Sequence, residues 1–325
     1  MSATGTETES YTVIDPWTME PLATDPRKRE VYRYDPYMRE GLMSFSRMEA
    51  LGSVRDHTFV VLKPDAIAGR RCGLILDTLA EEGWHPVAAT TVLFSPLLTR
   101  ELWRYQFNAA SEQRIAVVDH LLGSGRSLLV LLEDANRPAW LPASVRLTRA
   151  KGAADPTSAG RADLRTRIGR VNGLFNFMHT ADDPADLIRE TQLFSYQTGW
   201  AWCAPQLAAP ALGDPARRAT ARAAVTAHLA GLESEIPAHD LDVTRSLARL
   251  AGGRGPWADL AVEATDRARI GDWLEALRRT PLPDGTARWD VLSVVTAWIE
   301  CNEPGVTPFL PTGRADDWRT EGTYR

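Results

Sequence analysis

The sequence lacks the apolar segments that place proteins in or across membranes. None of its 325 residues belongs to a stretch that approaches the ~18 uninterrupted apolar residues of a membrane span. The polar N-terminal stretch MSATGTETESYTV has no apolar core of the kind found in secretory signals. We therefore expect neither a membrane span nor a secretory leader, and we expect a cytoplasmic protein without a membrane partner.

Cysteine is scarce, and basic charge is not in excess. Cys72, Cys203 and Cys301 lie far apart and form no CxxC pair, which argues against a zinc site or a disulfide framework and fits a reducing cytoplasm. The chain has 37 Lys and Arg against 42 Asp and Glu, for a net charge of −5. An excess of acidic over basic residues argues against a nucleic-acid partner.

The length predicts two domains, or one domain with large additions. Residues 1–56 mix Pro, Trp and Tyr irregularly and predict an extended arm, disordered over about its first 11 residues, with a short helix near 36–50. Residues 57–195 carry a regular pattern of strands and helices. Residues 196–325 are rich in Ala, Arg and Leu at helical spacing and predict an all-helical C-terminal domain. We expect tryptophans to anchor its packing: Trp257, Trp273, Trp289, Trp298 and Trp318.

Residues 57–195 alternate between the two kinds of secondary structure. Short apolar, β-branched runs predict four strands, at 58–62, 86–94, 128–132 and 173–178. Helical spacing and end signals predict helices at 74–82, 96–108, 111–122, 137–149 and 183–192. This order predicts an α+β fold of the ferredoxin-like kind, with a four-stranded antiparallel sheet and helices on one face.

Two motifs lie at the ends of this region. Lys63-Pro64-Asp65 directly follows the first strand, and Asn176-Phe177-Met178-His179 leads through an acidic turn into a helix with Glu190 and Phe194. Together these motifs and their spacing resemble the nucleoside diphosphate kinase family over residues 57–195. The resemblance implies a phosphotransferase that moves the γ-phosphoryl of a nucleoside triphosphate, through phospho-His179, to a nucleoside diphosphate or a specialised acceptor. It also implies ATP or another nucleoside triphosphate as donor, with Mg²⁺ bound through the nucleotide phosphates and no metal site on the protein.

The residues of the motifs suit this chemistry. A neutral imidazole is a good nucleophile near pH 7 and can hold a phosphoryl group covalently. Only one ring nitrogen can attack, so the other needs an acceptor, and Glu190 could fix that tautomer. Lys63 offers a point charge for a terminal phosphate oxygen. We therefore predict His179, Lys63 and Glu190 as catalytic residues.

Further residues are predicted to hold the nucleotide together with Lys63. Arg165 matches a family arginine that contacts phosphate, and Asn176 has the donor and the acceptor needed to read a sugar hydroxyl. Trp103 stands where the family has a tyrosine near the site. A family arginine before the phosphate loop has two candidate matches, Arg146 and Arg149, of which we assign Arg149 to the site.

The chain departs from the family pattern around these positions. Thr180-Ala181 replaces the Gly-Ser that follows the histidine, and Phe175 replaces the arginine before the asparagine. The phosphate-loop motif Gly-x-Thr-Asn-Pro becomes Gly152-Ala153-Ala154-Asp155-Pro156, so its threonine is missing. The aromatic residue that clamps the base falls near Arg114. The predicted catalytic residues are thus retained, while the residues that hold the nucleotide in the family are altered. This favours a specialised relative whose acceptor is a modified nucleotide or a small secondary metabolite.

Alternatives stay open at this stage. The domain could be a catalytically weak or inactive module that binds a nucleotide and recruits a partner, or the scaffold could carry other chemistry, such as nucleotidyl transfer or phosphate-ester cleavage. The C-terminal helices could cover the nucleotide pocket, contribute acceptor-site residues, or replace the family's subunit contacts. A homo-oligomer, a dimer and a monomer all remain open.

Overall fold

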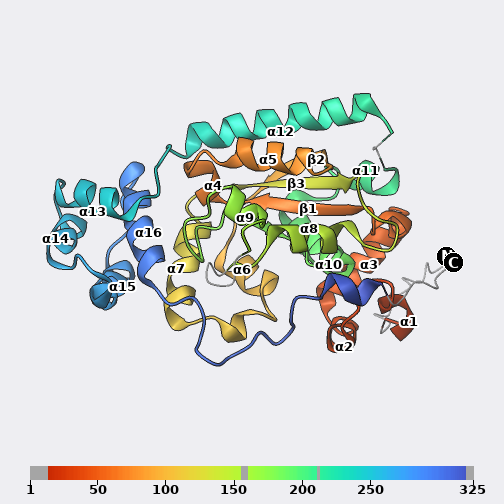
Figure 1. The fold of residues 1–325 in the computed structure, drawn as a ribbon, viewed down its shortest axis with the longest axis horizontal. Coiled ribbons are helices and arrows are strands. Elements are labelled where there is room, and N and C mark those ends of the chain that lie inside the picture. The colour runs from red at the N-terminus through yellow and green to blue at the C-terminus, as the bar shows by residue number, and fades with distance from the viewer. Residues whose placement is uncertain (1–13, 155–159, 211–212, 320–325) are drawn as a thin grey trace, which may run out of the picture.

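The computed structural model describes residues 14–154, 160–210 and 213–319. Its centre is a four-stranded antiparallel sheet with the order β2-β3-β1-β4 (Figure 1). The strands are β1 (His57–Leu62), β2 (Trp84–Val92), β3 (Ser127–Asp134) and β4 (Met178–Thr180). The α+β class and the antiparallel sheet predicted from the sequence are therefore confirmed.

The pairing of β1 with β4 brings the two sequence motifs together. Val61 lies opposite His179 in the register, and the backbone N–H of Lys63 donates to the carbonyl of Phe177 over 3.0 Å. Lys63 follows β1 directly and His179 is the middle residue of β4. The sheet thus brings together two motifs that lie 116 residues apart in the sequence, from 63 to 179.

Helices cover both faces of the sheet, not one as expected. Val60 and Leu62 of β1 pack on one side with residues of α4 (Pro64–Ala68), α5 (Cys72–Glu81) and α12 (Pro215–Glu235). Phe59 and Val61 point to the other side, into a second cluster with α3 (Pro36–Arg47), α6 (Pro96–Leu102) and α10 (Pro184–Thr198). Strands buried on both faces carry continuous apolar runs, and such runs do not reveal which face is covered.

Two predicted elements around the sheet have different bounds. The strand expected at 173–178 is reduced to Met178–Thr180, because Phe177 has a φ of +72° and its N–H donates to Oδ2 of Asp65 over 2.9 Å. The helix expected at 137–149 begins later. The remaining helices of this region are α7 (Glu112–Leu122), α8 (Ala143–Lys151) and α9 (Leu164–Arg167).

The N-terminal segment is largely helical, which corrects the prediction of an extended arm. It forms α1 (Pro16–Met19), α2 (Pro26–Tyr32) and α3. Asp25 and Asp35 are the N-caps of α2 and α3, and a proline follows each of them as the first helical residue. Asp-Pro pairs therefore act here as helix starts, not as irregular breaks. The disordered tail predicted for the first residues lies outside the described part of the chain.

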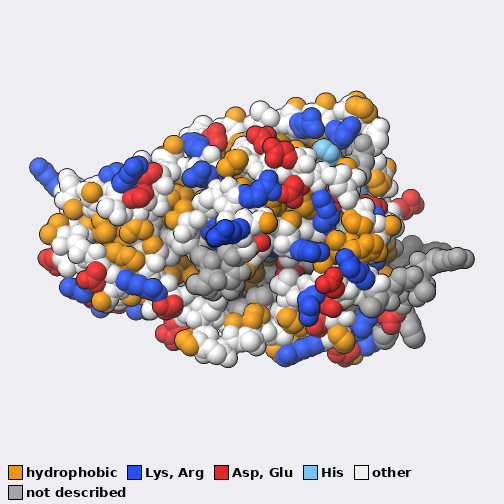
Figure 2. Space-filling model, viewed as in Figure 1, with side chains coloured by type: hydrophobic (Ala, Val, Ile, Leu, Met, Phe, Trp, Pro, Cys, Tyr) orange, Lys and Arg blue, Asp and Glu red, His pale blue; other side chains and the backbone are white. Residues whose placement is uncertain are grey.

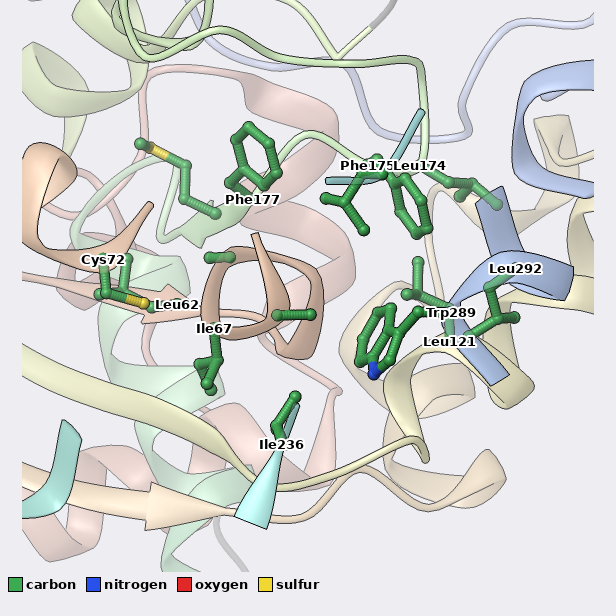
Figure 3. Close-up of a cluster of buried hydrophobic side chains, with 14 of the residues drawn as sticks. Leu62, Ile67, Cys72, Leu121, Leu174, Phe175, Phe177, Ile236, Trp289 and Leu292 are labelled. Carbon is green, nitrogen blue, oxygen red and sulfur yellow. The ribbon is translucent and has the colours of Figure 1, made fainter. Parts of the chain in front are cut away.

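The C-terminal region is mainly helical, as expected. Its helices are α11 (Ala204–Ala208), α12, α13 (Val243–Ala251), α14 (Pro256–Glu263), α15 (Ile270–Arg279) and α16 (Thr286–Trp298). Figure 3 shows Trp289 and Leu292 of α16 beside Leu121 and Phe175 of the sheet-bearing region. The two regions therefore share one apolar cluster.

After α16 the chain leaves the helical region as a strap, which we define as residues 299–319. Figure 1 shows it running back beneath the sheet to a short 3₁₀ helix, η5 (Ala315–Trp318). Trp318 is buried there against Leu141 and Val145, beside α8. The expected tryptophan anchor thus packs on the sheet-bearing region and not among the C-terminal helices.

One face of the molecule carries charges of both signs. Figure 2 shows acidic and basic side chains interspersed over the face that is viewed. Among the helices that the structure describes, none is long and apolar enough to cross a bilayer.

Candidate active site

His179 and Glu190 form the centre of the site. Nε2 of His179 lies 2.7 Å from Oε2 of Glu190, and both side chains are largely buried. Asp183 caps α10 by accepting from the N–H of Asp186 over 3.0 Å, which sets the start of the helix that carries Glu190. The structure thus places the predicted carboxylate beside the predicted nucleophile.

The protonation of this pair follows from its surroundings. Burial, followed by the positive charge of Lys151, lowers the pKa of His179 well below its usual range, so the ring is neutral near pH 7. Burial also raises the pKa of Glu190, while the positive charge of Arg189 opposes that rise. When Glu190 is ionised, Nε2 carries the ring proton and donates to the carboxylate, which leaves the lone pair on Nδ1. Among the described residues, none makes a hydrogen bond to Nδ1.

Lys63 is buried at the end of β1. Its Nζ donates to the carbonyl of Leu174 over 2.7 Å and lies 3.5 Å from Oδ1 of Asp65. Burial lowers the pKa of Lys63 to about 8, against the opposing charge of Asp65. The ammonium group is therefore charged at neutral pH but close to its titration range.

Arg165 and Asn176 line the inner cavity together with Lys63 and His179. Arg165 donates to the carbonyls of Gly152 and Met178 over 3.0 and 2.8 Å, and its Nε is buried without a partner among the described residues. Burial lowers the pKa of Arg165 to about 10, so it stays charged at neutral pH. Nδ2 of Asn176 donates to the carbonyl of Gly173 over 2.6 Å.

Aromatic rings enclose the imidazole. Trp103 meets the ring of His179 edge to face, with centroids 5.1 Å apart. Phe107 stacks on Trp103 at 5.9 Å, and the guanidinium of Arg114 lies 5.6 Å from the Phe107 ring. Sequence comparison placed Arg114 near the aromatic clamp and overlooked Phe107. The residues between 103 and 114 differ from the family in length, which hides this ring from a motif search.

The two candidate arginines of α8 differ in that only Arg149 lines a cavity together with His179. Arg146 donates to Oδ1 of Asp134 over 2.7 Å and lies 3.9 Å from the ring of Trp84, away from His179. Arg149 lines the same cavity as His179. Arg149 therefore stays the predicted site residue of the two.

His179 lines two cavities. The inner cavity, about 90 Å³, is lined by Lys63, Leu174 and Asn176. The outer cavity, about 650 Å³, is lined by residues of α8 and by residues 312–316 of the strap. Both cavities have the following side chains in common: Trp103, Arg114, Ala154, Arg165 and His179. The outer cavity falls within the range of small-molecule sites, roughly 300–1,000 Å³.

Lys151 is a site residue that sequence reasoning missed. It is buried at the end of α8, and its Nζ donates to Oγ1 of Thr180 over 2.7 Å and lies 3.4 Å from Oδ1 of Asp182. Burial lowers the pKa of Lys151. Its position as the residue before Gly152, in the segment aligned with the phosphate loop, was the available signal.

The departures from the family pattern have structural counterparts. Thr180 is buried and bonded to Lys151 and Thr148, so its hydroxyl faces α8. Phe175 is buried, with its ring 6.3 Å from that of Trp289 in α16. The C-terminal helices thus occupy the space beside this position. Ala154, at the position of the phosphate-loop threonine, lines both cavities, and Asp155 lies outside the described residues.

One family model matches the region that carries the two motifs. The family model "Nucleoside diphosphate kinase" matches residues 56–198. Residues 56–198 therefore form a nucleoside diphosphate kinase-like region, which is followed in this chain by a long C-terminal segment. No curated protein matches the sequence.

Several solved structures are similar over the family region. The nucleoside diphosphate kinase of Aquifex aeolicus has 21% identity and a TM-score of 0.35, covering 42% of this chain and 93% of that one. The Encephalitozoon cuniculi enzyme has 19% identity and a TM-score of 0.37, covering 43% and 88%. The Halobacterium salinarum enzyme, solved in complex with CDP, has 23% identity and a TM-score of 0.36, covering 42% and 86%.

Proposed function

We propose that the protein is a phosphotransferase that moves the γ-phosphoryl group of a nucleoside triphosphate to a second substrate through phospho-His179. One observation carries the proposal. Nε2 of His179 is held by Glu190 at 2.7 Å, while the ring lines two cavities that also present Arg114 and Arg165. A nucleophilic nitrogen with a fixed tautomer thus faces cationic groups, as phosphoryl transfer requires.

The first half-reaction would use the free nitrogen. The lone pair of Nδ1 attacks the γ-phosphorus, the N–P bond forms, the bond from phosphorus to the bridging oxygen breaks, and a nucleoside diphosphate leaves. The imidazole gains positive charge as it is phosphorylated. The ionised carboxylate of Glu190, hydrogen-bonded to Nε2, stabilises that charge without leaving its position.

The second half-reaction returns the site to its starting state. An oxygen of the acceptor attacks the phosphorus, the new P–O bond forms, and the N–P bond breaks with its electron pair returning to Nδ1. Lys63, which lines the inner cavity with His179, would bind a phosphate oxygen in both steps.

Unpartnered donors support anion binding at this place. The Nε atoms of Arg114 and Arg165 are both buried without a hydrogen-bond partner among the described residues, and both arginines line the two cavities. A buried N–H without a partner is costly unless a ligand satisfies it. Phosphate oxygens are strong acceptors for guanidinium groups.

The residues also suit a nucleotide that brings Mg²⁺ with it. The described part of the chain has no group of three or more His, Cys, Asp or Glu side chains that could hold a metal ion. Mg²⁺ would therefore be held by the phosphate oxygens. Arg114 and Arg165 would lie near the negative charge of the same phosphates. When bound, it supplies charge neutralisation and alignment of the phosphates.

Phosphohistidine formation is the direct test. We expect the protein incubated with γ-labelled ATP and Mg²⁺ to acquire a label that is labile in acid and stable in base. His179→Ala should abolish the label, and His228→Ala, a change in the distant helix α12, should retain it. Labelling that is absent, or equal in His179→Ala, contradicts the proposal.

A non-catalytic nucleotide-binding module is the alternative, and one contact favours it. Sγ of Cys301 packs so closely on Gly173 that a Cβ there would lie 2.8 Å from the sulfur. Gly173 lines the inner cavity, which holds only about 90 Å³. Calorimetry that detects ADP and ATP binding, with no phosphohistidine and no transfer to GDP, would favour this alternative.

A further inference from the structure

The strap supplies a wall of the active site that the family region does not contain. Residues 312–316 line the outer cavity together with His179 and Arg149. They lie more than 100 residues beyond the family match, which ends at 198. The wall is therefore an addition to the family domain and not part of its shared nucleotide site.

The wall is held in place on both sides. Leu310 is buried, and its N–H donates to the carbonyl of Tyr105 over 3.2 Å. Trp318 is buried against Leu141 and Val145. Between these anchors, Oγ1 of Thr312 donates to Oδ2 of Asp182 over 2.9 Å. A wall fixed in this way needs little ordering when a ligand binds.

The acidic side chains of the outer cavity are already engaged. Asp182 accepts from Thr312 and lies 3.4 Å from Lys151, and Glu190 holds His179. The remaining acids pair with cations outside the cavity lining: Asp186 with Lys28 at 2.7 Å, and Asp316 with Arg319 at 3.6 Å. Asp182, Asp186 and Asp316 therefore each have a cationic partner, whereas Glu190 is hydrogen-bonded to the neutral imidazole.

Two arginines of the outer cavity have no such neutralisation. Arg149 extends from α8 and Arg314 from the strap, and both are exposed to solvent. Within residues 14–154, 160–210 and 213–319, neither guanidinium has a carboxylate partner in an ion pair. Two guanidinium groups that line one cavity can bind the oxygens of a phosphate group in bidentate fashion.

We propose that Arg314 of the strap, with Arg149, forms a subsite for a phosphate group of the phosphoryl acceptor, and that the acceptor lies in the outer cavity. This inference rests on the proposed function of His179. It assigns to the C-terminal addition a role in acceptor recognition. The acceptor is then a phosphorylated compound, bound through its phosphate and oriented toward the imidazole.

Binding of inorganic pyrophosphate tests the subsite without any transfer step. Calorimetry on the full chain should show pyrophosphate binding that Arg314→Ala weakens by about tenfold or more, the effect of losing a charge-assisted hydrogen bond. Arg314→Lys should retain part of the affinity, and Arg278→Ala, an exposed change on α15, should retain all of it. Equal affinity of the wild type and Arg314→Ala overturns the assignment.

Discharge of the phosphoenzyme tests the role in transfer. Protein loaded with labelled phosphate from ATP is mixed with ADP below saturation, and the loss of label is followed in a single turnover. We expect Arg314→Ala to discharge about tenfold more slowly than the wild type, with the difference shrinking as ADP approaches saturation. Loading is measured separately. Failure of the wild type to load overturns the proposed function, whereas normal loading with unchanged discharge of Arg314→Ala overturns the subsite.

Discussion

Arg189 on α10 donates from Nε to Oδ2 of Asp35 over 2.9 Å, in the buried contact between α10 and the N-terminal helices. The hydroxyl of Tyr105 donates to the same oxygen over 2.8 Å. Arg189 directly precedes Glu190 in the chain. This ion pair therefore fixes the helical turn that presents Glu190 to His179.

Removing the carboxylate of this pair should destabilise the protein strongly. Asp35→Ala leaves the guanidinium of Arg189 buried without its charged partner, which costs about 3–5 kcal/mol of unfolding free energy. Urea unfolding followed by tryptophan fluorescence measures the change. Arg279→Ala, which removes an exposed ion pair with Glu275, is the control, with an expected loss below about 1 kcal/mol. A comparable loss in both variants would contradict the role assigned to the buried pair.

Glu190→Gln should reduce turnover while leaving substrate binding largely intact. The side-chain amide of glutamine can donate an N–H to Nε2 of His179. This favours the tautomer with its proton on Nδ1, and the protonated Nδ1 has no lone pair for the attack. We expect kcat to fall by about 10²–10⁴ with little change in KM. Steady-state transfer from ATP to GDP measures both constants. Glu263→Gln on α14 is the control, and an unchanged kcat in Glu190→Gln would rule out the orienting role.

The activity should depend on pH through Glu190 on the acid side. Because burial raises the pKa of Glu190, its ionised form is lost as the pH falls through that raised value, whereas His179 stays neutral. Activity should therefore fall with decreasing pH, and Glu190→Gln should lack this acid limb. A profile of kcat against pH checks this. An acid limb that persists in Glu190→Gln would assign it to another group.

Lys63 should govern the alkaline side. Its pKa is lowered to about 8 by burial, so its positive charge is present below that pH and lost above it. We expect kcat/KM for ATP to decline above about pH 8. In Lys63→Arg, whose charge persists to higher pH, the decline should move upward or disappear. Identical alkaline limbs in the two proteins would show that another group titrates there.

Trp289→Ala should destabilise the sheet-bearing region as well as the C-terminal helices. The indole is buried in the apolar cluster that contains Phe175 and Leu121, and its loss costs about 3–5 kcal/mol. We expect one cooperative unfolding transition, shifted to lower urea, whether it is followed by circular dichroism or by fluorescence. Two separate transitions would instead support the predicted boundary between independent domains near residue 195.

Local patterns explain why much of the family region could be predicted. The apolar run before Lys63 indicates a strand end, and the Asp183-Pro184 pair indicates the helix start that places Glu190 eleven residues after His179. Both signals depend on residues that are neighbours in the chain. The same reasoning failed for the N-terminal segment, where Asp-Pro pairs at 25–26 and 35–36 cap helices that gain their stability by packing on α10.

The sequence by itself therefore determined the class of the sheet, and it pointed to Lys63, His179 and Glu190, because strand periodicity and helix caps act over a few residues. Only the tertiary structure placed Lys151, Phe107 and the strap residue Arg314 around the same cavities. Their approach depends on buried anchors distant in the chain, such as Trp318 against Leu141. Such contacts arise from the collective burial of apolar surface, which no local pattern encodes.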